Sequence, residues 1–171
     1  MVPFYFAPVD ATDEQVHELQ ATELLLVMTL RYFAQQCRDA ASISPGWRDG
    51  FHAAGIDDCG VPAFDGLFRI IAAAALHPLN VRCRRCRFLG KDERLFLQLV
   101  SFLQYRQIGE AGQILTGWLP PAAAQMAMLP ALGLARALVR SRMIVPRRQT
   151  EETISTRTAS ALGDHGLALV H

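Results

Sequence analysis

The amino-acid sequence predicts an all-α protein, a single orthogonal or up-down bundle of about five to six helices. Apolar residues recur at helical spacing along several long segments, and alternation with a period of two never persists for the length of a strand. Gly and Pro residues divide the chain into segments of helical length joined by short loops. We expect residues 1–145 to form the helical domain. Residues 146–171 are rich in Ser, Thr and Arg and lack periodicity, so we expect a flexible, disordered tail there.

The first helix is predicted over residues 13–39, because no Gly or Pro interrupts the chain before Ser44. Thr12 and Gln15 fit a capping box at its start. The helix should be central, since residues 24–34 are apolar on nearly every side. A polar stripe along it should face water and contains Gln20, Glu23, Arg31, Gln35 and Arg38.

The middle of the chain predicts two shorter helices and a loop. Ser44 and Pro45 fit the N-cap and first position of a short helix, which should end at Gly55. A third helix is predicted over residues 62–76, and Pro78 stops it.

The loop covers residues 77–90 and has a short extended piece at residues 79–81. Asp92 and Glu93 then begin an amphipathic helix, because acidic residues complement the positive end of the helix dipole. The polar side of this helix, including Ser101, should face water.

The last part of the chain contains an uncharged run, residues 111–135, which resembles a membrane-spanning helix followed by arginines. We expect core helices instead, because Pro120 and Pro121 divide the run into pieces too short to span about 30 Å of hydrocarbon. These pieces are a helix over residues 110–118 and a last long helix, which Pro130 should kink or divide. The apolar stripe of the last helix contains Met128, Leu132, Ala135, Val139 and Met143.

Composition excludes two classes of protein. The chain is 51% hydrophobic with a net charge of +1, which excludes disorder throughout. Four cysteines in 171 residues are too few for a disulfide scaffold. The first residues, MVPFYFAPVD, have neither the basic segment nor the apolar run of a signal peptide, so we expect a cytoplasmic protein with reduced thiols. All but one of the 17 Lys and Arg residues are arginine, as is typical of a GC-rich bacterial genome.

The pair Cys83-x-x-Cys86 is the best candidate for chemistry, because two thiolates at this spacing can hold one tetrahedral zinc ion. Zinc requires two more ligands, for which the sequence offers Cys59 and His77, with His52 as a further option. The same pair also allows a redox interpretation, since neighbouring arginines favour reactive thiolates. A thioredoxin-like motif, however, belongs to an α/β pattern that this chain lacks.

Four arginines flank and separate these cysteines, namely Arg82, Arg84, Arg85 and Arg87. Arginine forms forked contacts to phosphates and carboxylates, so this run could contact nucleic acid or another anion. No aromatic residue interleaves the run, and the pI of about 7.8 is low for a nucleic-acid-binding domain.

The chain carries no phosphate-binding glycine loop, dinucleotide fingerprint or nucleophile elbow. A helical enzyme of unfamiliar type remains an alternative, with His52, Asp57, Asp58 or Cys59 in its site.

Charge is separated along the chain, with acids but no Lys or Arg in residues 1–30, and arginines but no acids in residues 82–87 and 136–148. We therefore expect a non-catalytic cytoplasmic binding protein, an adaptor or regulator that engages a protein partner or itself. The alternative is a zinc-stabilised module that binds nucleic acid or anions.

Overall fold

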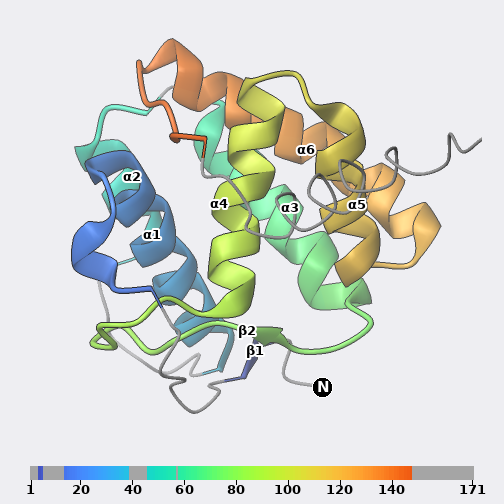
Figure 1. Ribbon diagram of the computed structural model, residues 1–171, viewed down its shortest axis with the longest axis horizontal. Coiled ribbons are helices and arrows are strands. Elements are labelled where there is room, and N and C mark those ends of the chain that lie inside the picture. The colour runs from blue at the N-terminus through green and yellow to red at the C-terminus, as the bar shows by residue number, and fades with distance from the viewer. Residues whose placement is uncertain (1–3, 6–13, 39–45, 57, 148–171) are drawn as a thin grey trace, which may run out of the picture.

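The structure, a computed structural model, describes residues 4–5, 14–38, 46–56 and 58–147, and confirms the all-α prediction (Figure 1). The predicted tail lies outside this part of the chain from residue 148 onward. Within the described residues a 3-10 helix, η1 (Val16–Glu18), precedes six α-helices. These are α1 (Ala21–Arg38), α2 (Trp47–Ala53), α3 (Gly60–Ala74), α4 (Lys91–Gln104), α5 (Ile108–Trp118) and α6 (Pro121–Arg140). Two short strands, β1 (Phe4–Tyr5) and β2 (Leu79–Asn80), pair in parallel.

The helices α3 and α6 form the most extensively packed pair and run antiparallel. Small residues face each other along the contact: a Cβ atom built on Gly133 would lie 3.3 Å from that of Ala63, and one built on Gly66 would lie 3.5 Å from that of Pro130. The two backbones therefore approach closely, as they can only where side chains are short. The sequence predicts that Pro130 kinks or divides the last helix. Helix α6 continues through Pro130, so the proline does not divide it.

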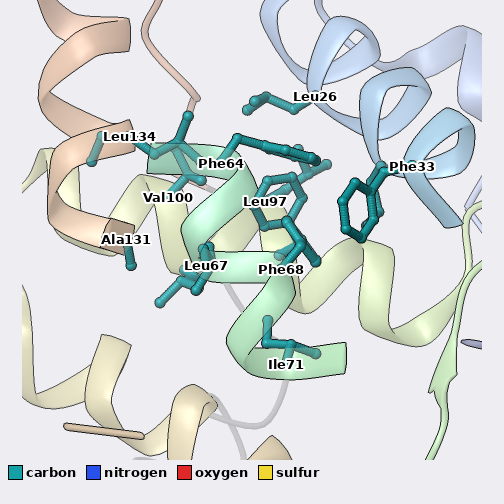
Figure 2. Packing of buried hydrophobic residues seen from close by; sticks show 14 of the residues in the cluster. Leu26, Phe33, Phe64, Leu67, Phe68, Ile71, Leu97, Val100, Ala131 and Leu134 are labelled. Atoms are coloured by element: carbon teal, nitrogen blue, oxygen red, sulfur yellow. The ribbon is translucent and has the colours of Figure 1, made fainter. Parts of the chain in front are cut away.

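A cluster of aromatic side chains joins α1, α2, α3 and α4. Phe64 of α3 lies at its centre, with ring centroids 4.8 Å from Trp47 and 4.6 Å from Phe68. Phe68 in turn lies 5.0 Å from Phe96, and Phe33 approaches the same rings from α1. Figure 2 shows that this cluster continues into aliphatic side chains of α3, α4 and α6. One contiguous hydrophobic core therefore links the elements on both sides of α3.

The start of α1 corrects the predicted helix over residues 13–39. The helix begins at Ala21, and Thr12 lies outside the described residues. The backbone before it is used differently: the Val16 N–H donates to the Arg87 carbonyl at 2.8 Å, and the Leu89 N–H donates to the Glu14 carbonyl at 2.8 Å. These bonds pair residues 14–16 with the loop before α4, so this segment does not join α1.

The polar stripe predicted on α1 is also wrong in part, because Glu23 and Arg31 are buried. The Glu23 carboxylate accepts the Gln20 N–H at 2.8 Å and so caps the first turn of α1. Burial raises the pKa of Glu23, and that hydrogen bond lowers it by less. Ser101, predicted to face water, is buried on α4, and its hydroxyl lies 3.4 Å from the Val145 carbonyl.

The remaining helices lie within about two residues of their predicted bounds, but the apolar stripe predicted on the last helix is wrong in part: Val139 is 44% exposed, and Met143 lies beyond the end of α6 at Arg140. Helix α2 ends at Ala53, and Gly55 adopts φ +65°, a left-handed conformation that favours glycine, as predicted for the end of this helix. The predicted N-cap at Ser44 is wrong, because α2 begins at Trp47 and its N-cap is Gly46; Ser44 itself lies outside the described residues. The extended piece predicted at residues 79–81 is confirmed as β2, and the Val81 N–H donates to the Tyr5 carbonyl at 3.2 Å.

Candidate functional site

Residues 81–90, here called the cysteine loop, connect β2 to α4 and are held to the helices by hydrogen bonds from buried side chains. In Figure 1 it runs below α1. Both ends of the loop are buried, and its middle reaches the surface. The exposed residues are Cys83, Arg85 and Arg87, and the half-buried ones are Arg84, Cys86 and Phe88.

An ion pair inside the protein holds this loop. The Arg31 Nε atom donates to Glu93 Oε1 at 2.7 Å, and both side chains are fully buried. The remaining guanidinium nitrogens donate to the carbonyls of Cys86 at 2.7 Å and of Phe88 at 2.8 Å. A side chain of α1 therefore fixes the backbone of the loop directly.

The Glu93 carboxylate completes the anchor from α4. It accepts the Gly90 N–H at 2.7 Å and the Arg82 N–H at 3.1 Å. The neighbouring Asp92 accepts the Asn80 N–H at 2.6 Å and the Trp118 Nε1–H at 2.8 Å. The two acidic residues predicted to begin this helix thus also bind the loop, β2 and α5. Buried carboxylates with this many donors are satisfied rather than reactive.

The structure separates the four predicted zinc ligands. Cys83 and Cys86 share one turn of the loop, but Cys59 precedes α3 and His77 follows it. Fifteen residues of helix, about 22 Å at 1.5 Å per residue, lie between these last two, so they cannot bind one ion. No group of three or more His, Cys, Asp or Glu side chains in the described ranges is arranged to hold a metal.

The four predicted anion-binding arginines also separate. Arg82 is buried and does not belong to the surface set. The Arg84 guanidinium lies over the Tyr32 ring, 4.9 Å from its centroid. Arg85 and Arg87 are exposed, so the loop presents fewer arginines than the sequence predicts.

The alternative catalytic set does not converge on a protected site. His52 lies on α2, whereas Asp58 and Cys59 lie in the turn before α3, and all three are exposed. Asp57 lies outside the described residues. Catalysis generally requires a cavity that orients its groups and excludes water, and the exposed positions of these side chains do not provide one.

A second surface feature is the exposed side of α6, which sequence reasoning missed. Leu129 and Met126 are 77% and 66% exposed, more than any other large hydrophobic residue in the described part of the chain. Ala122 is exposed one turn earlier, and no charged residue lies between positions 111 and 135. These three residues lie outside the apolar stripe predicted for this helix. They recur at 3- and 4-residue spacing on a separate face of the helix, and this spacing is the sequence signal that could have revealed the exposed apolar side of α6.

The described residues include one helix, α6, that is long and apolar enough to cross a membrane by length and composition. Core helices pass the same test, and the opposite side of α6 packs on α3, α4 and α5. Comparison of the chain with known protein families, with characterised proteins and with solved structures finds no match.

Proposed function

We propose that this chain is a non-catalytic, cytoplasmic bacterial binding protein, an adaptor or regulator that engages a protein partner through the exposed side of α6. The observation that carries the proposal is the exposure of Leu129 and Met126 one turn apart, in the part of α6 before Arg136, which carries no charged residue. Large apolar side chains exposed together mark surfaces that bind other proteins, because burying them in a complex removes apolar area from water.

The same side of α6 also indicates the chemistry of the partner. Arg136 follows Leu129 by seven residues, two helical turns further along the same face, and it is exposed. The face therefore changes from apolar to basic toward its C-terminal end. A complementary partner is a helix with an apolar stripe followed by Asp or Glu residues, since opposite charges at the rim fix the register of a complex.

The experiment maps the contact by position. A photoreactive phenylalanine analogue replaces Leu129 in the full chain, and in a matched control it replaces Leu24, an apolar residue of α1 that is 39% exposed. We expect a cross-linked partner at position 129 only, and we expect its cross-linked segment to carry the apolar and acidic pattern described above.

A synthetic peptide of the cross-linked segment then gives the affinity. Leu129→Glu should weaken its binding about thirtyfold, the loss expected when a hot-spot side chain worth about 2 kcal/mol is removed. Arg136→Glu should weaken it as well, and Leu24→Glu should leave it unchanged. Equal cross-linking at both positions overturns the proposal. So does concentration-dependent dimerisation of the chain through Leu129, or binding to anionic lipid vesicles that Leu129→Glu abolishes.

The cysteine loop supports a second candidate function, the binding of an anionic ligand. The specific observation is that Arg85 and Arg87 project from a backbone fixed by the buried Arg31–Glu93 pair. Because the backbone is fixed, the loop loses less conformational entropy when these side chains bind a phosphate or carboxylate. Single-stranded DNA is the probe: binding should weaken as salt rises, and Arg85→Glu with Arg87→Glu should abolish it. Binding that these charge reversals leave unchanged contradicts the loop as its site.

A further inference from the structure

The two cysteines of the loop are held at the ends of one tight turn. The Cys86 N–H donates to the Cys83 carbonyl at 3.0 Å, which places Arg84 and Arg85 at the corners of a β-turn. A β-turn brings its first and last Cα atoms within about 7 Å. Disulfides join Cα atoms about 4.4–6.8 Å apart, so the turn brings the two Cα atoms into the range of separations that a disulfide spans.

The anchoring of the turn makes this geometry persistent. Arg31 binds the Cys86 carbonyl from one side, and Glu93 binds the N–H of Arg82, directly before Cys83, from the other. Both anchoring side chains belong to long helices and are fully buried. A turn held at both ends keeps the second thiol at a high effective concentration near the first.

The two thiols also differ in access. Cys83 is exposed, and Cys86 is half-buried. A disulfide from solution therefore reaches Cys83 first, and Cys86 is placed to resolve the product from inside the same turn. Arg85 and Arg87 are exposed beside the thiols and suit the carboxylates of an acidic small disulfide.

The other two cysteines of the chain lack this arrangement. Cys37 lies near the end of α1, and Cys59 lies before α3, each without a second cysteine in its own turn. Partial desolvation raises the pKa of the Cys37 thiol, so less of it is in the reactive thiolate form at neutral pH. These two cysteines serve as internal controls.

We propose that Cys83 and Cys86 are a reversible redox pair, a site of thiol–disulfide exchange with an anionic low-molecular-weight disulfide of the glutathione type. The Cys83 thiolate attacks one sulfur of the small disulfide, a mixed disulfide forms, and one small thiolate leaves. The Cys86 thiolate then attacks the Cys83 sulfur, the intramolecular disulfide forms, and the second small thiolate leaves. The two protein thiols lose two electrons, the small disulfide gains them, and the two thiol protons pass to the departing thiolates.

The test mixes the full reduced chain with glutathione and glutathione disulfide at a series of ratios and samples the reaction over time. Free thiols are then trapped by alkylation, and disulfides are mapped by mass spectrometry after digestion. We expect a disulfide between Cys83 and Cys86 to form about tenfold faster than any bond involving Cys37 or Cys59, because only the loop pair reacts intramolecularly. Added dithiol should reverse it.

Three variants separate the two steps of the exchange. Cys86→Ser should stop the reaction at glutathione bound to Cys83, seen as added mass on that residue. Arg31→Lys weakens the anchor of the turn, so the same mixed disulfide should accumulate transiently. Cys59→Ser is the matched control, and it should leave the rate of disulfide formation unchanged.

Two results would overturn the proposal. One is glutathione distributed over the cysteines without preference and without a bond between Cys83 and Cys86. The other is a zinc ion shared by the loops of two copies, which protects both thiols from oxidation until a chelator removes it. Because the mapping uses the unmodified chain, its outcome does not depend on a variant folding. It is also independent of the α6 surface, so either proposal can fail without the other.

Discussion

Arg31 is the residue on which the cysteine loop depends, because its guanidinium reaches a carboxylate and two backbone carbonyls at once. It lies among apolar residues of α1, where an unpaired charge would be strongly destabilising. Glu93 neutralises it and binds two backbone N–H groups of the loop. The pair therefore couples the position of a surface segment to the packing of α1 against α4.

Breaking this pair should show that the two residues act together. Arg31→Met and Glu93→Gln should each lower the free energy of unfolding by about 3–5 kcal/mol, because each leaves a buried partner without its charge. The double variant should lower the free energy of unfolding by clearly less than the sum of the two single losses, since it leaves neither charge buried. Urea denaturation of the four proteins gives the coupling energy.

A surface pair provides the comparison for that measurement. Arg69 Nε lies 2.6 Å from Asp65 Oδ2, but the Arg69 side chain is 71% exposed. Arg69→Met should lower the free energy of unfolding by no more than about 1 kcal/mol, because water and salt screen exposed pairs. A loss for Arg31→Met no larger than this would mean that the buried pair contributes nothing beyond a surface contact.

The sequence could not reveal the role of Arg31, and the reason is physical. Polar residues on a helix usually face water, so Glu23 and Arg31 were assigned to one solvated stripe. Arg31 pairs with a residue 62 positions later, and the contact exists only once α1 and α4 have packed. Ser101 was predicted to face water for the same reason, and the residues that it contacts are likewise distant in sequence. Long-range partners of single polar residues leave no local pattern.

At the scale of the elements, the helices were predictable because residues close to their ends in the sequence, chiefly Gly and Pro, determine where they begin and end. Gly55 ends α2 in a left-handed conformation, and Pro121 stands at the first position of α6. The start of α1 was not predictable from its capping signals, because the competing backbone bonds of residues 14–16 come from the distant loop. The close contact of α3 with α6 was hidden as well, since glycine and alanine carry no strong hydrophobic pattern.

Two glycine substitutions of opposite sign test how tightly these elements pack. Gly60→Ala should destabilise the protein by about 1–3 kcal/mol, because its methyl group would overlap the buried Ile56 side chain and press on Ala137 of α6. Gly112→Ala should stabilise it by about 0.5–1 kcal/mol, because this site lies inside α5 and the new methyl meets only Met128, at 3.9 Å. Thermal and urea denaturation measure both, and equal effects of the two changes would contradict close packing at α3.

At the scale of the whole molecule, the sequence predicted the class of fold but not the arrangement of its candidate site. Helical periodicity and the positions of Gly and Pro suffice for a bundle, since both are local properties of the chain. Zinc ligands must converge in space, and Cys59 and His77, though only 18 positions apart, lie beyond opposite ends of α3. The sequence predicts that the whole uncharged run belongs to the core, because an uncharged sequence does not show which side of its helix packs on other helices and which side is exposed.

The two tryptophans report on different ends of the molecule and test whether it folds as one unit. Trp47 packs in the aromatic cluster with Phe64 of α3, whereas the Trp118 carbonyl accepts the N–H of Leu76, which follows the other end of α3. We expect each single-tryptophan variant, Trp47→Phe and Trp118→Phe, to show the same urea midpoint by fluorescence as by far-ultraviolet circular dichroism. One core runs along α3 between the two sites, so we expect both ends to lose their packing together. A fluorescence midpoint that precedes the loss of helix in either variant would instead divide the bundle into two units that unfold separately.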